Sequence, residues 1–241
     1  MTDYTDAAET YDNTRTYSDE VIDRFRAGVA LTPSTCVLDF GCGTGNYLSR
    51  IYERFGCQCY GVEPSDAMRN KAQSKTGSLE IVQGDHLAIP LPSEHFDFCY
   101  MTDVIHHVPD VLSMFRELLR VLKAGAVLCV VTESYAQIDA RNRYFPSLAV
   151  NEKRRYPDIG EISARASEVG FCVTAREVLS SPARCISEDF LRNVAEKNWS
   201  MFRLLSEDEF TSGLQALQHD RGLSFESPGA GETFLWFRKP V

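Results

Sequence analysis

The chain has 241 residues, of which 44% are hydrophobic and 24% are charged, so a disordered, collagen-like or coiled-coil protein is excluded. With 25 Lys and Arg against 34 Asp and Glu, the net charge of −9 disfavours DNA, RNA and anionic membranes as general partners. The longest strongly apolar run, AVLCVV, is too short to span a bilayer, and the start shows no leader pattern. We therefore expect a cytoplasmic protein.

The first 34 residues are polar and rich in tyrosine, and apolar residues at helical spacing from Val21 to Val29 predict one amphipathic helix there. From residue 35 onward, short apolar runs alternate with helical patterns, which is typical of successive βαβ units around a parallel sheet. Strands are predicted at 35–40, 57–62, 79–83, 96–101, 126–132 and 171–178, and helices at 46–55, 65–75 and 157–169. A further helix is predicted to open at Pro109 and to close at Gly125.

Two segments depart from this alternation. Residues 134–156 are polar and aromatic, and residues 187–220 carry two amphipathic helical patterns, anchored by Phe190, Leu191, Trp199, Phe210, Leu214 and Leu217. An aromatic strand is predicted at 233–239. We expect one domain over residues 1–241, with 1–34 as an N-terminal helical cap and with 134–156 and 180–230 as additions on the substrate side.

The chain has eight cysteines, but its length and apolar content make a stabilising disulfide framework unnecessary. Cys36, Cys99 and Cys129 lie in apolar runs, where free cysteine behaves as a small buried hydrophobe. Cys57 and Cys59 lie on one predicted strand, and no CxxC or HxxxH motif completes a zinc set with them. The sequence therefore predicts no metal site.

The densest functional signal is VLDFGCGTGNYL, in which a buried strand leads through Gly41, Gly43 and Gly45 into a helix. Glycines allow a sharp turn and close approach of a ligand, although turns packed tightly for other reasons also use them. A dinucleotide fingerprint needs a third glycine at position 46, where this chain has Asn46. The pattern therefore argues against a nicotinamide cofactor.

Glu63 ends the second predicted strand. A carboxylate there can accept hydrogen bonds from both hydroxyls of a ribose, a feature that nicotinamide and S-adenosylmethionine sites share. Glu63 therefore predicts a site for an adenosine group but does not specify which cofactor contains it. The alternative is a solvated charge at the end of a strand.

Together these motifs resemble the class I S-adenosylmethionine-dependent methyltransferases, particularly the branch that acts on small molecules. VLDFGCGTG is similar to the first motif of that family, YGVEPSDAM to its acidic second strand, GDHLAIPLPSEHFDFCYMTDVIHHV to its third and fourth segments, and ELLRVLKAGAVLCVV to the following helix and strand. The likeness covers about residues 11–133 well and Gly170, Phe171 and the terminal strand loosely. It implies a Rossmann-like, doubly wound α/β sheet of seven strands, mostly parallel with an antiparallel terminal strand and helices on both faces.

The resemblance also implies the cofactor-binding residues. Asp39 with the loop of Gly41, Gly43 and Gly45 would hold the methionine end of S-adenosylmethionine, and Glu63 the ribose. Asp85 would accept from the adenine amino group, while Met68 and His86 contact the ring. For Asp85 the alternative is a turn-forming aspartate after a glycine.

Three further residues complete that set of cofactor-binding candidates. Thr102 follows the fourth predicted strand, at the crevice of an open α/β sheet. Tyr11 and Arg15 lie in AETYDNTRTYS, which resembles the family's entry helix, and would fold over the cofactor. Their alternative is an exposed helix face.

His106 and His107 follow the same strand, in the segment that flanks the transferable methyl group in the family. An imidazole can take the proton of a nucleophile, so one of them is a candidate general base. Alternatively, one histidine caps the next helix or fills space while solvent takes the proton. Transfer to an oxygen, nitrogen or carbon by in-line displacement can then depend mainly on positioning.

Residues 141–155 form a local basic patch, with five basic residues against one acidic residue, Glu152. The remainder of the chain carries 20 basic and 33 acidic residues, a net charge of −13. Such a patch would attract a small acceptor that bears a carboxylate or phosphate. The candidate substrate-binding residues are Arg141, Arg143, Tyr144, Arg154 and Arg155. The alternative is a solvated loop paired with neighbouring carboxylates.

Two other functional classes stay open. One is an NAD-dependent oxidoreductase, which Asn46 disfavours. The other binds S-adenosylmethionine but catalyses a different reaction, or none. The sequence does not specify the acceptor, the methylated atom or the oligomeric state.

Overall fold

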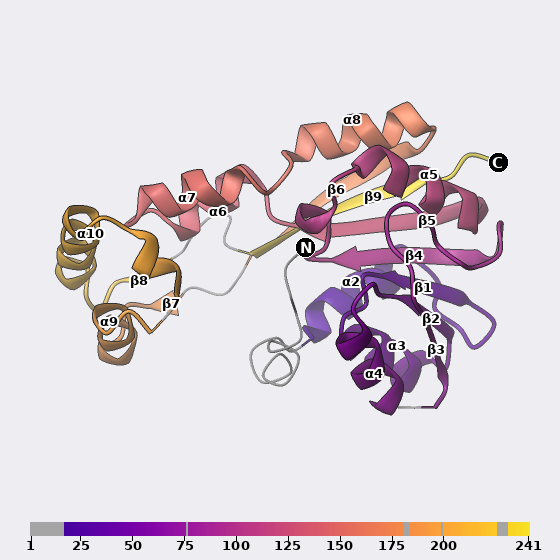
Figure 1. Cartoon of the computed structure of the whole chain (residues 1–241), viewed down its shortest axis with the longest axis horizontal. Helices are drawn as coiled ribbons and strands as arrows, with labels where there is room; N and C mark the ends of the chain where they lie inside the picture. Colours follow the sequence, from indigo (N-terminus) through magenta and orange to yellow (C-terminus); the bar gives the residue numbers. More distant parts are fainter. Residues whose placement is uncertain (1–16, 76, 181–183, 199, 226–230) are drawn as a thin grey trace. The chain divides into compact units, whose positions relative to one another are not determined.

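The computed structural model describes residues 17–75, 77–180, 184–198, 200–225 and 231–241 (Figure 1). The chain divides into two compact units. Unit 1 comprises residues 1–131, 160–176 and 234–241, and unit 2 comprises residues 132–159 and 177–233. The candidates Tyr11 and Arg15, and the predicted anchor Trp199, lie outside the described residues.

A seven-stranded sheet has the strand order β3-β2-β1-β4-β5-β9-β6 (Figure 1). Its strands are β1 (Cys36–Phe40), β2 (Gln58–Val62), β3 (Leu79–Val82), β4 (Phe96–Thr102), β5 (Leu122–Thr132), β6 (Cys172–Ser180) and β9 (Gly231–Arg238). The pairs β1–β2, β1–β4, β2–β3 and β4–β5 are parallel. The terminal strand β9 enters between β5 and β6 in the antiparallel sense, which confirms the predicted fold class.

Helices cover both faces of this sheet: α2 (Asp19–Gly28), α3 (Asn46–Phe55), α4 (Asp66–Lys75), α5 (Val111–Val121) and α8 (Ile159–Val169). Alternation along β9 assigns the faces, because neighbouring side chains on a strand point to opposite sides. Phe25 of α2 packs on Phe234 and Trp236, whereas Phe115 of α5 packs on Phe237. In Figure 1 α3 and α4 accordingly lie on the other side of the sheet from α5 and α8.

The prediction for the helix before β5 was wrong at both ends. Pro109 lies before the helix and not in its first turn, because Asp110 is the N-cap: its side chain accepts from the backbone N–H of Ser113 at 3.0 Å. The helix ends at Val121, and Leu122 already belongs to β5. Gly125 (φ +75°) lies within that strand, in a bulge of the type that needs a left-handed glycine.

Hydrogen bonds to Lys239, the residue that follows β9, define this bulge. The N–H of Gly125 donates to the carbonyl of Lys239 at 3.0 Å, and the N–H of Lys239 donates to the carbonyl of Ala126 at 2.9 Å. Ala126 is therefore the residue opposite Lys239, and the antiparallel register of β5 and β9 continues from that pair.

All eight cysteines are free, and six of them are buried, including Cys36, Cys99 and Cys129 as predicted. Among the described residues, no cluster of three or more His, Cys, Asp and Glu side chains could hold a metal ion. No helix in the described part of the chain is long and apolar enough to cross a membrane.

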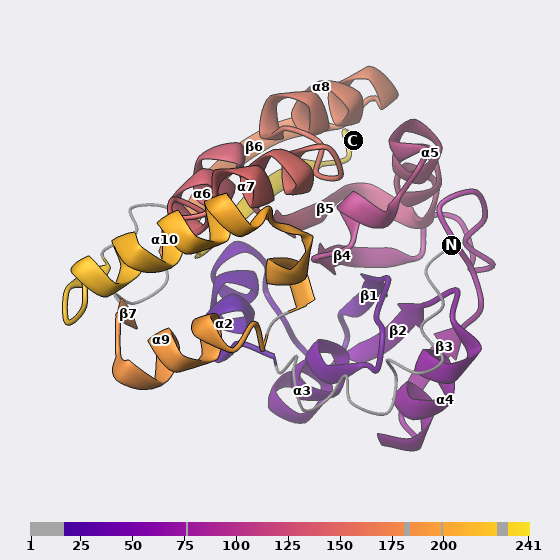
Figure 2. The same cartoon turned by 60° about the vertical axis from the view of Figure 1, so that its left-hand side comes forward.

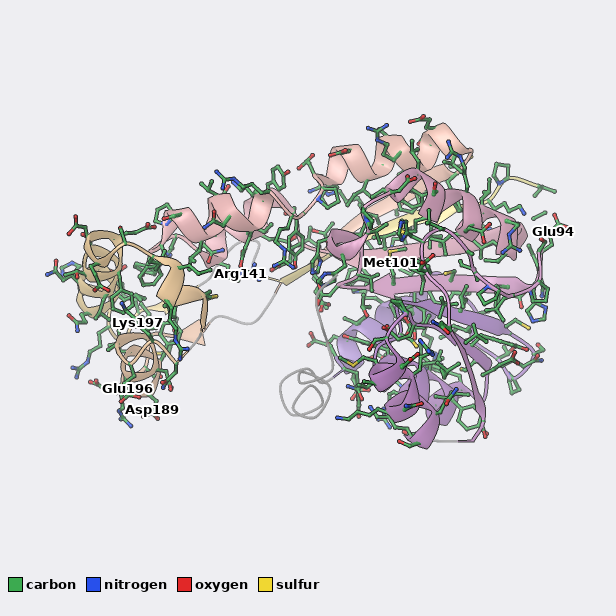
Figure 3. All side chains as sticks on the ribbon, viewed as in Figure 1. Glu94, Met101, Arg141, Asp189, Glu196 and Lys197 are labelled. Carbon is green, nitrogen blue, oxygen red and sulfur yellow. The ribbon has the colours of Figure 1, made fainter. Side chains whose placement is uncertain are left out.

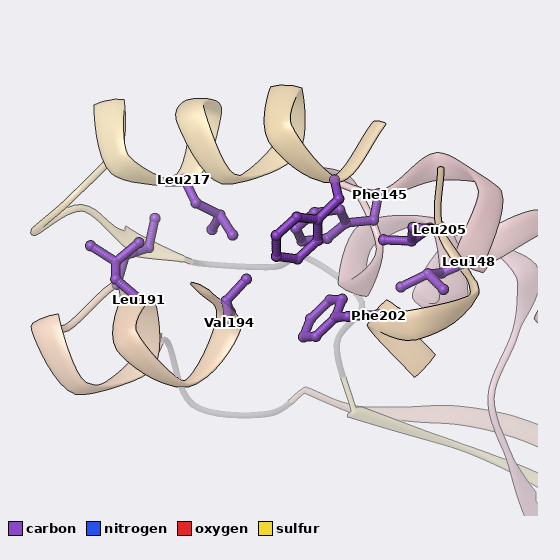
Figure 4. Packing of buried hydrophobic residues seen from close by; sticks show 9 residues of the cluster. Phe145, Leu148, Leu191, Val194, Phe202, Leu205 and Leu217 are labelled. Atoms are coloured by element: carbon purple, nitrogen blue, oxygen red, sulfur yellow. The ribbon is translucent and has the colours of Figure 1, made fainter. Parts of the chain in front are cut away.

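Unit 2 has a hydrophobic core of its own (Figure 4). Its elements are α6 (Tyr135–Arg141), α7 (Pro146–Lys153), α9 (Glu188–Ala195), a 3₁₀ turn η2 (Ser200–Leu204), α10 (Glu207–His219) and the strand pair β7 (Arg184–Cys185) and β8 (Ser224–Phe225). The core consists of Phe145, Leu148, Ile186, Leu191, Val194, Phe202, Leu205, Phe210 and Leu217. Figure 2 shows α10 beside α7, and Glu209 of α10 accepts from the backbone N–H of Ser147 at 2.8 Å.

Gly213 lets α10 approach the connection between α6 and α7. A Cβ atom at this position would lie 2.4 Å from both the Phe145 ring and the backbone oxygen of Tyr144. Alanine normally stabilises a helix relative to glycine by about 1 kcal/mol. Here the backbone oxygen of Tyr144 cannot move away independently, so close packing outweighs that preference.

We predict that Gly213→Ala lowers the free energy of unfolding by about 1–3 kcal/mol, as overpacked cores do. The matched control is Ser212→Ala at the neighbouring exposed position, which should leave stability within about 0.5 kcal/mol of the parent. Urea unfolding measures both variants. A Gly213→Ala protein as stable as the Ser212→Ala protein would contradict this packing account.

Candidate active site

The loop between β1 and α3 needs glycine for backbone conformation and for space. Gly41 has φ +76°, and a Cβ there would lie 2.6 Å from a methyl carbon of Val104. Gly45 has φ +73° at the start of α3, and its Cβ would lie 3.1 Å from that of Ala72. The N–H of Gly41 donates to the carbonyl of Val62 at 2.8 Å, which ties the loop to the end of β2.

Glu63 holds this loop against the start of α4. One carboxylate oxygen accepts from the N–H of Gly43 at 3.0 Å and the other from the N–H of Ser65 at 2.9 Å. The side chain is only 8% exposed, so the alternative of a solvated strand-end charge does not describe it. Burial raises the pKa of Glu63, while the two backbone donors oppose that rise. Each oxygen keeps a lone pair for a further donor.

Asp39, the last residue but one of β1, is buried beside Tyr100 of β4. The Tyr100 hydroxyl donates to Oδ2 of Asp39 at 2.9 Å. Oδ1 is buried and has no hydrogen-bond partner in the described part of the chain. Burial raises the pKa of Asp39 to about 7, the tyrosine bond lowers it, and the nearby Glu63 charge raises it. The site therefore holds an acceptor oxygen that a bound cation or N–H donor could engage.

The candidates for the adenine end lie on two elements. Met68 is buried within α4, while Asp85 and His86 are half-buried in the turn after β3. Oδ1 of Asp85 accepts from the N–H of Leu87 at 2.8 Å and from that of Ala88 at 3.3 Å. Asp85 thus forms its turn, as the alternative for this residue proposed, and these two bonds use one carboxylate oxygen.

The histidine pair lies in a short 3₁₀ turn, η1 (Ile105–His107), directly after β4. Thr102, half-buried, ends β4 and pairs with Val131 of β5. The rings of His106 and His107 have centroids 4.0 Å apart with planes tilted by 45°, and His106 is half-buried while His107 is exposed. One imidazole of the pair is therefore accessible to solvent, and the other is partly covered.

The basic patch of unit 2 contains two classes of side chain. Arg141, labelled in Figure 3, forms ion pairs with Glu133 at 2.8 Å and with Glu152 at 2.5 Å. Three other members are also engaged: Tyr144 donates to Asp220 at 2.7 Å, Arg143 lies 3.8 Å from Asp220, and Lys153 pairs with Asp139.

Arg154 and Arg155 differ from the rest of the patch. Both are exposed, and neither forms an ion pair with any described residue; Arg154 makes one long bond, of 3.4 Å, to the amide oxygen of Asn151. The alternative of a loop paired with carboxylates thus describes Arg141, Arg143 and Lys153, and leaves these two arginines available to an anion.

Sequence reasoning missed several residues that support the loop. Tyr100 binds Asp39, Arg69 donates to the backbone carbonyl of Glu63 at 2.8 Å, and Lys75 donates to Thr44 at 3.2 Å. Lys75 also binds the side-chain oxygen of Asn46. A polar Tyr100 inside an apolar strand beside that of Asp39 was a usable signal. Arg69 and Lys75 gave none, because their positions on a polar helix resemble any solvated face.

A family model described as a methyltransferase domain matches residues 38–130. An uncharacterized methyltransferase of Geobacillus kaustophilus is 35% identical over 163 residues, which are 62% of this chain and 74% of that protein.

Two solved structures share the fold. Haemonchus contortus phosphoethanolamine N-methyltransferase 2, in complex with phosphomonomethylethanolamine and S-adenosylhomocysteine, has a TM-score of 0.61 and 18% identity, covering 100% of this chain and 58% of that chain. The [4+2]-cyclase SpnF has a TM-score of 0.64 and 19% identity, covering 95% of this chain and 84% of that chain.

The fold and the glycine loop with its two carboxylates define a class I S-adenosylmethionine-dependent methyltransferase. The chain belongs to the methyltransferase family that its Geobacillus relative represents. The nicotinamide alternative is thereby set aside.

The residues of unit 1 fit S-adenosylmethionine as the cofactor. The orphaned, buried Oδ1 of Asp39 is an acceptor that matches the ammonium group of a methionine moiety. Both carboxylate oxygens of Glu63 lie at the carboxyl end of β2 and retain acceptor capacity, which matches the paired hydroxyls of a ribose.

A pH dependence follows from the raised pKa of Asp39. The unfolded carboxyl titrates near 3.9, so between about pH 4 and pH 7 the folded protein binds more protons than the unfolded chain. This stability contribution is full below pH 4 and is lost as the pH rises through 7. We predict that the free energy of unfolding decreases by up to about 4 kcal/mol between pH 4 and pH 7 because of Asp39. The Asp39→Asn variant should not show this decrease.

Urea unfolding of the cofactor-free protein from pH 4 to pH 8 measures this effect as the difference between parent and Asp39→Asn. Tyr100→Phe is the matched control, because it deletes the hydroxyl that lowers the pKa of Asp39. In this variant the decrease in the free energy of unfolding should extend to higher pH. A parent-minus-variant difference that is flat over the window would exclude the assignment.

A further prediction concerns Gly41. Gly41→Ala should lower the free energy of unfolding by about 2–4 kcal/mol, because a left-handed alanine and the contact with Val104 each have a cost. Adding Val104→Ala removes the two methyl carbons that would lie 2.6 and 2.8 Å away, and it leaves the backbone cost. The double-mutant cycle should therefore show a coupling of at least about 1 kcal/mol. Simple additivity of the two substitutions would refute the steric argument.

Proposed function

We propose that the methyl acceptor is a small metabolite bearing a carboxylate or a phosphate, and that Arg154 and Arg155 attract and hold it. The observation that carries this proposal is the contrast within the basic patch. Three of its basic residues are neutralised by nearby carboxylates, whereas these two are exposed and form no ion pair with a described residue. Guanidinium groups suit this task, because their paired donors match the oxygens of carboxylate and phosphate.

Charge elsewhere on the chain supports this choice of substrate. Outside residues 141–155 the net charge is −13, so an anion is repelled by most of the surface and attracted by the patch. The Haemonchus enzyme of the same fold was solved with phosphomonomethylethanolamine, a small phosphate-bearing molecule. A substrate of that chemical class is consistent with two unpaired arginines.

The remaining candidate residues take distinct roles in this proposal. Asp39, Gly41, Gly43, Gly45 and Glu63 bind the cofactor at its methionine and ribose ends, with Met68, Asp85, His86 and Thr102 toward the adenosine and the crevice. S-adenosylmethionine, when bound, supplies an activated methyl group on a sulfonium. His106 or His107 accepts the proton that an oxygen, nitrogen or carbon nucleophile loses. Positioning provides most of the acceleration in such a reaction.

The setting proposed for this reaction is the cytoplasm, with a soluble metabolite as partner and neither a nucleic acid nor a membrane. The acidic composition supports this choice, because it gives polyanions little attraction over most of the chain.

A second candidate function keeps the cofactor and changes the reaction. SpnF, a [4+2]-cyclase, has the same fold as this chain. The fold alone is therefore compatible with a reaction other than methyl transfer on the same cofactor site.

The proposal predicts that Arg154→Ala/Arg155→Ala raises the KM of the acceptor at least tenfold, or about 1.4 kcal/mol, with little change in kcat. In the assay, small carboxylates and phosphomonoesters are added as candidate acceptors, and the S-adenosylhomocysteine formed from the cofactor is measured. Mass spectrometry detects the methylated product. Arg192→Ala/Arg203→Ala is the matched control, because it removes the same charge from exposed positions of the same unit. It should leave KM within about twofold.

Equal KM values for the two double variants would rule out the arginine site. Turnover of an added compound that gains no methyl group would favour the second candidate function instead.

A further inference from the structure

Gln137 of α6 has a side-chain orientation that is determined by its neighbours. Its Oε1 accepts from the backbone N–H of Ser134 at 2.6 Å and from the Thr233 hydroxyl at 2.6 Å. A backbone N–H can only donate, so the oxygen of the amide must face Ser134 and the amide cannot be flipped. Its Nε2 group consequently points away from both partners.

That Nε2 group is a buried donor without an acceptor among the described residues. Gln137 is 1% exposed, so the fold shields its amide from bulk water. Native proteins rarely leave buried donors unpaired, because the lost hydration is not replaced. A glutamine that served only as a helix cap would be satisfied through its oxygen and would not need to bury two further N–H donors.

Thr132, the last residue of β5, is a second buried group of this kind. It is 0% exposed, and its hydroxyl has no partner in the described part of the chain. The register set by Ala126 and Lys239, carried along β5 and β9, places Thr132 opposite Thr233. Opposite residues of an antiparallel pair project to the same face, with Cβ atoms about 5 Å apart. Thr132 therefore lies beside the same threonine that binds Gln137.

Thr132, Gln137 and Thr233 thus form one buried polar cluster in unit 2, which we call the threonine–glutamine cluster. The cluster lies at the carboxyl end of β5, since Thr132 directly follows Val131, the partner of Thr102. Open α/β sheets bind their ligands at this end of their strands. Two buried polar groups without a partner among the described residues therefore lie at the end of the sheet where such folds bind ligands.

We propose that the threonine–glutamine cluster is a recognition site for an oxygen of the methyl-accepting substrate, with Gln137 Nε2 donating to a carboxylate or phosphate oxygen and the Thr132 hydroxyl as a second donor. This inference rests on the proposed function, because it assigns a further contact to the same anionic acceptor. The arginines attract the anion through charge, while the cluster selects it through directed hydrogen bonds.

Gln137→Glu tests the donor without removing the structural bonds. The introduced carboxylate keeps an oxygen for Ser134 and Thr233, and it replaces Nε2 by an oxygen that repels an anion. Thr132→Val removes only the second hydroxyl. Ser134→Ala is the structural control: it deletes the hydroxyl that accepts from the N–H of Gln137 at 3.3 Å and retains the backbone N–H bound to Oε1.

The experiment uses the full chain saturated with S-adenosylhomocysteine, and two probes of different anion type, sarcosine for a carboxylate and phosphoethanolamine for a phosphate. Calorimetry measures the dissociation constant of each probe. Nuclear magnetic resonance follows the side-chain amide signal of Gln137, which is identified by its loss in Gln137→Glu. Thermal unfolding of each variant reports stability separately.

The expected result is a shift of the Gln137 amide signal on binding of at least one probe. Gln137→Glu should weaken that probe at least tenfold and Thr132→Val at least threefold, while affinity for S-adenosylhomocysteine stays within twofold. Ser134→Ala should lower the unfolding temperature and leave probe affinity unchanged. The probe that produces the shift identifies the anion type.

Three results would overturn this inference or separate it from the proposed function. If a probe binds and the Gln137 amide signal does not shift, a resident water and not the substrate occupies the cluster. The proposal for the two arginines then still holds. A moving signal with no effect of Arg154→Ala/Arg155→Ala supports the cluster and refutes the arginine site. Failure of both probes to bind contradicts both proposals.

Discussion

The two hydrogen bonds that the Glu63 carboxylate accepts from Gly43 and Ser65 hold the functional part of this protein together. Both partners are backbone groups, so the side chain fixes the path of the chain at the end of β1 and at the start of α4 simultaneously. Arg69 then fixes the backbone of Glu63 itself. The carboxyl ends of the first two strands are therefore locked in one arrangement, with the glycine loop between them.

This arrangement requires two acidic side chains to be buried close together. Asp39 responds with a pKa near neutrality, and Tyr100 compensates only one of its oxygens. Such a site is costly while it is empty and becomes favourable when a cation or an N–H donor enters. The same reasoning applies to Gln137, where a donor rather than an acceptor is left buried. In the described part of the chain, unit 1 thus holds a buried acceptor without a partner and unit 2 a buried donor without one.

Much of the fold could be read from the sequence, because parallel strands buried on both faces are written as short apolar runs separated by helical periodicity. The limits of the helix before β5 could not, since Gly125 is a good helix terminator and an equally good bulge residue. The glycine loop and Glu63 were visible as a motif. The contacts of three other residues could not be predicted, because spacing along the chain does not encode them. Tyr100 binds Asp39 across 61 residues, and Arg69 binds a backbone carbonyl. Gln137 binds Thr233 of β9.

The place of β9 between β5 and β6 has a consequence for how the molecule forms. Among the described strands, β6 lies at the edge of the sheet and pairs with β9 alone, although about fifty residues of chain separate the two. On the ribosome, β6 must emerge and wait until residues 231–238 have been made before it can pair. Until then the backbone groups of β5 and β6 that later pair with β9 form open strand edges, which is the kind of intermediate that chaperones bind and that aggregates when they are scarce.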